Sequence, residues 1–212
     1  MNKILFTAVA VLLTLSTAMA QKDPAALQVL DAMSAKYQSI PAFTANFSYI
    51  MENEDEGIDE KFEGLITVKD VKYKLIMSGQ EIVNDGETVW TYIKDDNEVT
   101  ISEYDGSEEE ISLSNIFTIY KDGYKYLFLA EKDNGKVSVI DLVPEDRDKD
   151  FYKIRMEIQK SDNALKNFRI FDKSGSRYLY KINDFKTNST IKDADFEFNE
   201  NRYPGVEIVD FR

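Results

Sequence analysis

The stretch Phe43-Thr44-Ala45-Asn46-Phe47-Ser48-Tyr49-Ile50-Met51 decides the fold, because large apolar residues recur at every second position. A period of two predicts a β-strand with one face turned toward a core. The same spacing returns along the chain, so we expect a protein built mainly of short strands. The further runs are Ile66 and Val68; Tyr73, Leu75 and Met77; Val99 and Ile101; Val137 to Leu142; Ile154, Met156 and Ile158; Phe168 and Ile170; Tyr178, Tyr180 and Ile182; and Phe196 and Phe198.

Turn signals lie between these runs. Asx-Gly and Ser-Gly pairs favour the positive φ that tight hairpins require, and local hairpins make an antiparallel sheet. An open sheet of about ten or more strands tends to curl, so a barrel or part-barrel is expected. The pairs are Asp85-Gly86, Asp105-Gly106, Asp122-Gly123, Asn134-Gly135 and Ser174-Gly175.

Two helical segments interrupt the strands. Asp23-Pro24 provides an N-cap and a proline at the first helical position, and the helix is expected to end at Ile40-Pro41. Its apolar face carries Leu30, Met33 and Tyr37. A second, short helix is predicted between Ser114 and Tyr120, with the apolar residues Ile116, Phe117, Ile119 and Tyr120. The acidic stretches 52–60 and 108–110 are interpreted as solvated loops.

The N-terminus has the features of a secretion signal. Lys3 precedes an apolar run from Ile4 to Leu15, and Ala18-Met19-Ala20 is a small-x-small cleavage site. The run is short for a membrane span, so an uncleaved anchor is the less favoured alternative. We therefore expect residues 1–20 to be a signal peptide and 21–212 to form a single exported domain.

Composition excludes several classes of function. The net charge is −13, and −14 once Lys3 is removed, which disfavours binding to nucleic acid or to anionic membranes. The chain has no His and no Cys, so histidine bases, thiol nucleophiles, disulfides and zinc thiolate sites are excluded. Carboxylates remain available, but no paired acid and base is visible, and a hydrolase is the third and weakest hypothesis. We expect no cofactor and a monomer.

One carboxylate spacing matches a calcium loop. Asp146, Asp148 and Asp150 precede Glu157 at the spacing of an EF-hand. However, Phe151 stands where such a loop needs glycine, and the residues after it alternate like a strand. A solvated hairpin turn is the better prediction.

The most informative feature that remains is an excess of large apolar side chains. Half of the side chains of a curled sheet point inward, and a barrel of this size need not be filled by them. An ordinary packed core remains the alternative. The candidates from the alternation are Phe47, Tyr49, Tyr73, Met77, Trp90, Tyr92 and Met156.

Four segments resemble the periplasmic outer-membrane lipoprotein carriers of the LolA type. Residues 85–92 (DGETVWTY) are similar to that family's D-G-x-T-[LV]-W-x-Y segment, and 43–47 to its first strand. Residues 64–69 (GLITVK) resemble its G-x-L-x-V-K strand. Residues 195–208 resemble its C-terminal F-x-F and P-x-G-V motifs.

The resemblance implies an unclosed antiparallel β-barrel, for which we expect about 11 strands, with an N-terminal helix and a short second helix that form a lid. The cavity would take the acyl chains of lipoproteins that an ATP-driven transporter releases from the inner membrane. The protein would carry them through the periplasm to the outer membrane, where the resemblance does not identify the acceptor. Carried over by the resemblance, Phe47 and Tyr73 fall on the cavity wall, Tyr37 on the first lid helix, and Ile116 and Phe117 on the second. Together with the strand alternation and the helical pattern, this gives the predicted cavity residues Phe47, Tyr49, Ile66, Val68, Tyr73, Leu75, Met77, Trp90, Tyr92 and Met156, and the predicted lid residues Leu30, Met33, Tyr37, Ile116, Phe117, Ile119 and Tyr120.

The chain departs from the family at one place. An arginine followed by proline usually comes after the G-x-L-x-V-K strand and latches the lid, whereas this chain has Lys69-Asp70-Val71-Lys72. Lys69 or Lys72 is a candidate substitute, although lysine lacks the guanidinium fork. The alternative function is a related half-barrel that senses or binds another lipid or hydrophobic ligand.

Overall fold

The computed structural model describes residues 22–105, 111 and 113–212, and the predicted signal peptide lies outside them. The described chain forms one 12-stranded sheet that is not closed, with strand order β12-β6-β5-β4-β3-β2-β1-β11-β10-β9-β8-β7. The strands are β1 (Ala42–Asn53), β2 (Ile58–Lys69), β3 (Lys72–Met77), β4 (Gln80–Asn84), β5 (Thr88–Ile93), β6 (Glu98–Glu103), β7 (Tyr124–Lys132), β8 (Val137–Pro144), β9 (Phe151–Gln159), β10 (Leu165–Asp172), β11 (Arg177–Thr187) and β12 (Glu207–Asp210). The prediction of an unclosed β-barrel is confirmed, with one strand more than expected.

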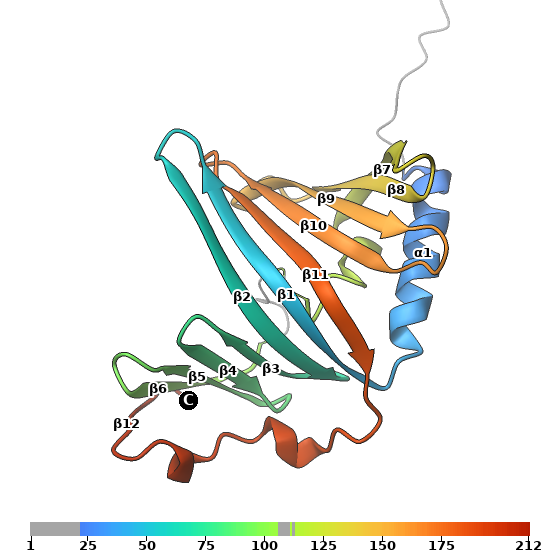
Figure 1. Cartoon of the computed structure of the whole chain (residues 1–212). Helices are drawn as coiled ribbons and strands as arrows, with labels where there is room; N and C mark the ends of the chain where they lie inside the picture. Colours follow the sequence, from blue (N-terminus) through green and yellow to red (C-terminus); the bar gives the residue numbers. More distant parts are fainter. Residues whose placement is uncertain (1–21, 106–110, 112) are drawn as a thin grey trace, which may run out of the picture.

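The long strands β1, β2 and β11 connect two differently oriented halves of the sheet, β3–β6 and β7–β10 (Figure 1). Neighbouring strands are antiparallel as predicted, except that β12 pairs with β6 in parallel. The register of β1 with β11 shifts between Asn46 and Phe47. Because such irregularities bend and twist a strand, this one helps the sheet to curl.

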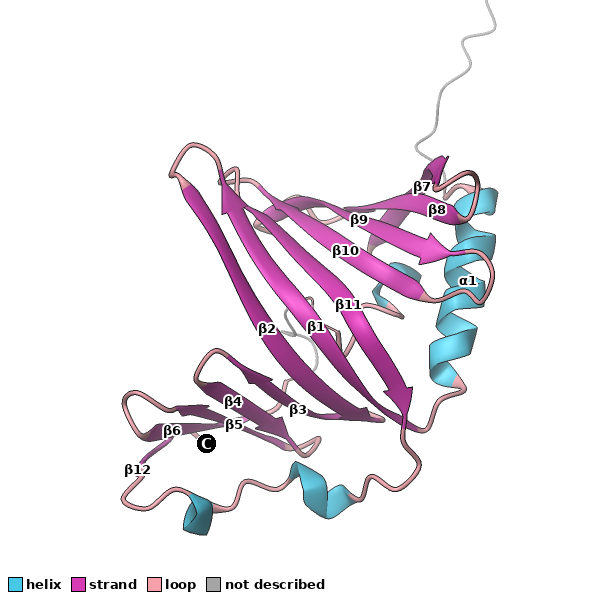
Figure 2. Ribbon diagram, viewed as in Figure 1, coloured by secondary structure: helices cyan, strands magenta, loops and turns pink. Residues whose placement is uncertain are grey.

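Helix α1 (Pro24–Gln38) lies across the concave side of the β7–β10 half (Figure 2). It begins as predicted, with the Asp23 carboxylate accepting a hydrogen bond from the Ala25 backbone N–H. The same Asp23 accepts from the N–H of Phe128, and its own N–H donates to the carbonyl of Tyr126. Asp23 therefore caps the helix and also satisfies part of the free edge of β7.

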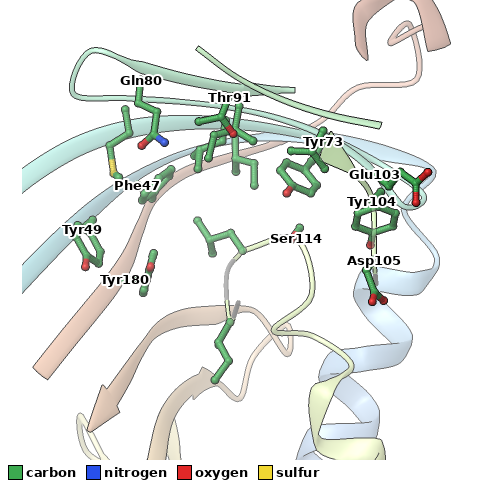
Figure 3. Close-up of a pocket in the computed structure, with 17 residues that line it drawn as sticks. Phe47, Tyr49, Tyr73, Gln80, Thr91, Glu103, Tyr104, Asp105, Ser114 and Tyr180 are labelled. Atoms are coloured by element: carbon green, nitrogen blue, oxygen red, sulfur yellow. The ribbon is translucent and has the colours of Figure 1, made fainter. Parts of the chain in front are cut away.

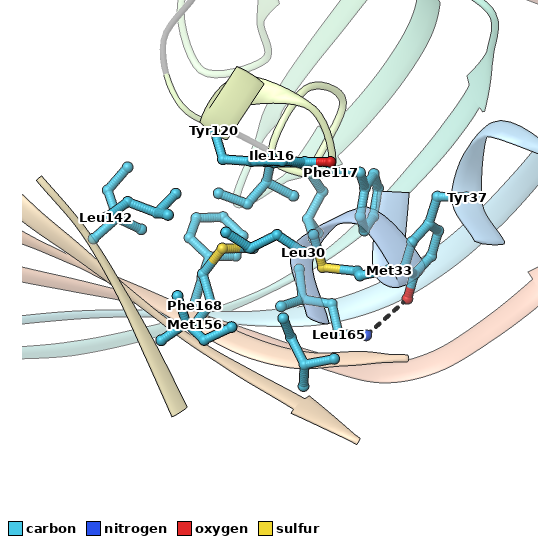
Figure 4. Close-up of a cluster of buried hydrophobic side chains, with 14 of the residues drawn as sticks. Leu30, Met33, Tyr37, Ile116, Phe117, Tyr120, Leu142, Met156, Leu165 and Phe168 are labelled. Atoms are coloured by element: carbon cyan, nitrogen blue, oxygen red, sulfur yellow. Dashed lines mark hydrogen bonds between the residues drawn. The ribbon is translucent and has the colours of Figure 1, made fainter. Parts of the chain in front are cut away.

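The helix's apolar face fills this half of the sheet. Leu30 and Met33 are fully buried, and they belong to one cluster with Leu142, Met156 and Phe168 (Figure 4). Among the described residues, no helix is both long and apolar enough to cross a membrane.

The predicted second helix is replaced by a shorter structure. Residues 113–118 form consecutive turns, and only Ile119–Lys121 make a 3₁₀ helix, η1. The prediction of a short helix over residues 114–120 is therefore wrong for most of this segment, and only its end is helical. The acidic stretch 52–60 is also not a loop throughout, because β1 continues to Asn53 and β2 begins at Ile58. The acidic residues 108–110 lie outside the described residues.

The segment after β11, which we call the C-terminal arm (residues 188–212), runs along the outer side of the β3–β6 half (Figure 1). It contains η2 (Asp193–Phe196), η3 (Glu200–Arg202) and β12. The alternation at Phe196 and Phe198 predicted a strand here, which is wrong: Phe196 ends η2, where its side chain is fully buried. Phe196 is apolar because its side chain is buried, and not because it belongs to a strand.

Gly64 is required where β2 passes β1. It pairs with Phe47, and a Cβ at this position would clash with Cζ of the Phe47 ring. The missing side chain therefore makes room for a ring that is itself 2% exposed.

We predict that Gly64→Ala lowers the free energy of unfolding by about 1–3 kcal/mol, because the Phe47 ring must leave its position. Urea denaturation measures the change. In the double variant Phe47→Leu/Gly64→Ala the penalty of the alanine should largely disappear, since the shorter side chain removes the clash. Strict additivity of the two substitutions would contradict this packing.

Candidate functional site

A pocket with a volume of about 470 Å³ opens on the concave side of the sheet, beside the region that α1 fills (Figure 3). Its walls come from β1 to β5 and β11, and residues 103–105, 111, 113 and 114 complete it. The lining residues are Phe47, Tyr49, Ile66, Tyr73, Leu75, Met77, Gln80, Ile82, Val89, Thr91, Glu103, Tyr104, Asp105, Ile111, Leu113, Ser114 and Tyr180.

The strand register explains why these side chains meet. Ile66 pairs with Leu75, Leu75 with Ile82, and Ile82 with Thr91, so one row across four strands faces the pocket. On the other side, Tyr49 pairs with Tyr180. Paired residues share a face of the sheet. A continuous wall therefore follows from the hairpins themselves.

The pocket leaves apolar side chains accessible. Tyr73, Leu75, Met77 and Ile82 are only partly buried, although they lie on the inner face. In the β7–β10 half the corresponding residues Met156 and Phe168 are fully buried, because α1 covers them. A concave apolar surface that the chain does not cover with its own helix is typical of a binding site.

The sequence-predicted cavity residues divide into two groups. Six of the ten line this pocket: Phe47, Tyr49, Ile66, Tyr73, Leu75 and Met77. The others do not. Met156 lies in the core cluster with the helix residues, and Val68 lines a smaller hollow of about 280 Å³ beside Tyr37 and Phe117.

Trp90 and Tyr92 were assigned to the wrong face of β5. Their neighbours Val89 and Thr91 line the pocket, so the alternation turns Trp90 and Tyr92 to the outer side. There the Tyr92 ring lies 4.3 Å from that of Tyr203 in the C-terminal arm. Tyr92 thus contacts the arm, and the smaller side chains of Val89 and Thr91 face the pocket.

Most of the predicted lid residues form a packed cluster. Leu30, Met33, Tyr37, Ile116, Phe117 and Tyr120 are buried, and Ile119 is partly buried against them (Figure 4). The pocket itself is bounded by residues that sequence reasoning missed, Ile111, Leu113 and Ser114, just before this cluster. We call residues 113–121 the lid segment.

Besides this apolar packing, a ring stack and a hydrogen bond join the lid segment to α1. The rings of Tyr37 and Phe117 stack with centroids 3.7 Å apart. The Tyr120 hydroxyl donates a hydrogen bond of 2.6 Å to the Asp31 carboxylate. Tyr37 also reaches the sheet, because its hydroxyl oxygen accepts from the Leu165 N–H at 3.1 Å.

Burial is the main reason that both phenols stay neutral. Burial raises the pKa of Tyr37 to about 12. Burial first, and then its hydrogen bond to Asp31, raise the pKa of Tyr120 to about 12.

The lysines proposed as substitutes for the family's latching arginine have another partner. Lys69 and Lys72 both pair with Asp193 of the C-terminal arm, at 2.6 Å and 3.4 Å. Their ammonium groups lower the pKa of the Asp193 carboxyl. These lysines therefore fasten the arm, whereas the stack of Tyr37 on Phe117 and the hydrogen bond of Tyr120 fasten the lid segment to the helix.

The structure does not assemble the calcium-like spacing. Asp146 to Asp150 lie in the connection between β8 and β9, as the hairpin prediction required, and Glu157 lies within β9. The Glu157 carboxylate accepts hydrogen bonds from Lys132 and Asn167. Within the described ranges, no group of three or more acidic side chains is placed to hold a metal ion.

Comparison with known proteins identifies relatives over most of the chain. The sequence profile of the family described as outer membrane lipoprotein carrier protein LolA matches residues 42–199. A protein of Legionella pneumophila (strain Lens) named outer-membrane lipoprotein carrier protein is 24% identical over 187 residues, which cover 84% of this chain and 88% of the relative.

Solved structures share the fold at low identity. An uncharacterized conserved protein from Thermus thermophilus superposes with a TM-score of 0.57 at 14% identity, covering 88% of this chain and 99% of that one. The lipoprotein LppX of Mycobacterium tuberculosis gives a TM-score of 0.50 at 12% identity, covering 80% of this chain and 100% of that one.

We predict that Tyr120→Phe loosens the lid segment. The substitution keeps the ring but removes a hydrogen bond to a carboxylate, so amide hydrogen exchange across residues 113–121 should become about tenfold faster. Tyr203→Phe is the matched control, because the Tyr203 hydroxyl donates to the Glu81 carboxylate and holds the C-terminal arm instead. It should speed exchange in the arm alone. Equal exchange in the lid segment of both variants would contradict the assignment.

We also predict alkaline destabilisation. The folded pKa values of Tyr37 and Tyr120, about 12, exceed the ordinary value of 10, so ionisation is easier in the unfolded chain. The stability they provide is present below about pH 10 and is lost as the pH rises toward about 12. Urea unfolding at several pH values in this range should show the decline, with a shallower slope in Tyr37→Phe. An unchanged slope in that variant would contradict the burial effect.

Proposed function

The chain belongs to the outer membrane lipoprotein carrier family, LolA, and we propose that it carries lipoproteins through the periplasm, with their acyl chains in the pocket bounded by the lid segment. The observation that supports this proposal is the apolar row Ile66, Leu75 and Ile82 on the pocket wall, in which Leu75 and Ile82 stay partly exposed beside the lid segment. An ATP-driven inner-membrane transporter would supply the cargo, and an acceptor at the outer membrane would receive it. The carrier would be exported after cleavage behind residue 20 and act as a monomer.

The energetics favour a pocket of this kind for acyl chains. Burial of each methylene contributes about 0.8 kcal/mol. The lid segment is held by its hydrogen bond, its ring stack and the burial of Leu113, Ile116 and Phe117, so the many methylenes of whole acyl chains are needed to match it. Cargo that enters the pocket can therefore displace this segment without unfolding the sheet. The lid segment and the ligand compete for the same apolar wall.

The family is one of carriers rather than enzymes, and the pocket agrees with binding as its task. Its polar groups are hydroxyls, an amide and two carboxylates at the rim, next to a large apolar wall. The alternative function, binding of another lipid or hydrophobic ligand by the same half-barrel, draws on the altered lid attachment, since Lys69 and Lys72 bind the arm and not the lid.

Capture of lipoproteins distinguishes the two functions. Purified protein is incubated with inner-membrane vesicles that hold a radiolabelled acylated lipoprotein and the releasing transporter, and the soluble complex is measured after ATP addition. ATP-dependent transfer of the lipoprotein to this chain supports the carrier. Absence of transfer, with a small lipid bound to protein purified from its own periplasm, supports the alternative.

Adjacent residues of β3 provide a matched pair of variants. Leu75 faces the pocket, whereas Ile76 is 43% exposed on the outer face. We predict that Leu75→Asp lowers lipoprotein capture at least about tenfold, because a carboxylate in the apolar wall loses its hydration when an acyl chain enters. Ile76→Asp should leave capture unchanged. Equal capture by the two variants would place the acyl chains elsewhere.

A further inference from the structure

The polar groups of the pocket are uncharged over most of its wall. Gln80 and Thr91 line it from β4 and β5, and Tyr73 from β3, with their polar atoms on the pocket side (Figure 3). Among the described residues that line the pocket there is no Lys and no Arg. The sequence has 26 Lys and Arg residues, so their exclusion from this wall is a property of the strand alternation and not of composition.

The alternation places the nearby cations outside. Lys74 stands next to Leu75 in β3, but it pairs in register with Val83 and forms its 2.6 Å ion pair with Glu81 on the outer face. Lys72 lies on the same outer side and binds Asp193. The basic residues of β3 thus lie on the outer face, where each has an acidic partner.

The charges that do border the pocket are negative. Glu103 and Asp105 lie at one end, where Figure 3 shows them with Tyr104, away from Phe47 and Tyr180. Arg212 lies near enough to Glu103 for that carboxylate to contribute to its raised pKa, but its main partner is Asp210, which it binds through two nitrogens. Arg212 is not among the residues that line the pocket.

A buried donor without an acceptor lies on the same face. Asn84 pairs in register with Tyr73 and with Val89, which both line the pocket. Its side-chain oxygen accepts from the Gly86 N–H, but its Nδ2 has no hydrogen-bond partner among the described residues, although Asn84 is fully buried. Asn84 is not among the residues that line the pocket, so this donor lies behind the wall and is not one of the pocket's own polar groups.

We infer that the pocket selects acyl lipids with an uncharged polar part, such as glycerol esters, and discriminates against lipids with an anionic headgroup. The inference rests on the proposed function, because it assumes that acyl chains occupy the pocket. Ester carbonyls and hydroxyls can pair with Gln80 and Thr91, which line the pocket. A carboxylate or phosphate would lose water without gaining a cation, and it would approach the rim carboxylates.

Two lipids with the same chain test the headgroup alone. Monopalmitoylglycerol and palmitate, both kept below their micellar concentrations, are titrated at pH 8 against protein loaded with the neutral fluorophore N-phenyl-1-naphthylamine. We expect monopalmitoylglycerol to displace the fluorophore at least about tenfold more tightly than palmitate. Equal affinities would overturn the inference. Displacement by neither lipid would overturn the acyl-chain pocket itself, and with it the proposed function.

A second test adds a cation to the pocket wall. Gln80→Lys places an ammonium group at the pocket wall and should raise palmitate affinity about tenfold, so that the preference narrows. Ile76→Lys adds the same charge on the outer face and should leave the ratio unchanged. If Gln80→Lys, shown to be folded by its circular dichroism spectrum, does not change the ratio, headgroup charge does not govern selection and the inference fails.

Discussion

The pairing of β1 with β2 on one side and β11 on the other is the constraint on which the rest of the structure depends. β1 is paired with β2 at every residue from Ala42 to Asn53, and with β11 from Phe43 to Glu52. This central ladder fixes which side chains face inward in both halves of the sheet. A slip of one residue would turn Phe47 and Tyr49 outward and remove the pocket wall. The contact of Phe47 with Gly64 opposes such a slip, because only glycine leaves room for the ring.

The two halves of the sheet differ in how their concave apolar faces are covered. In the β7–β10 half, the helix stripe Leu30 and Met33 covers the concave face and gives a fully buried core. In the β3–β6 half, the large aromatic residue Trp90 lies on the outer side, so smaller residues such as Val89 and Thr91 face inward. Apolar surface there stays accessible. The hollow therefore results from the distribution of side-chain size between the two faces of β5.

Much of this fold follows from local sequence, because caps and alternation act over a few residues. Asp23-Pro24 and the spacing of Leu30, Met33 and Tyr37 predicted α1 almost to its ends. The phase of a strand is harder to predict where both faces are apolar. In β5 either Val89 with Thr91 or Trp90 with Tyr92 could face inward, and the contacts of Tyr92 with Phe198 and Tyr203 of the arm, at the far end of the chain, explain why the second pair faces outward. Likewise, nothing local to Lys69 and Lys72 predicts Asp193 as their partner.

The lid contacts also bear on how a carrier of this design would release its cargo. A hydrogen bond to a carboxylate contributes about 1.5–3 kcal/mol, and an aromatic stack about 0.5–1.5 kcal/mol. A fully buried 16-carbon chain would gain about 13 kcal/mol at about 0.8 kcal/mol per methylene. In the proposed carrier, closure of the lid segment would also rebury Leu113, Ile116 and Phe117, and together with the Tyr37–Phe117 and Tyr120–Asp31 contacts this would offset much of that gain. Under the proposed function, release would then be completed by a surface that buries the acyl chains at least as well, so the acceptor and the lid segment would together determine the direction of transfer.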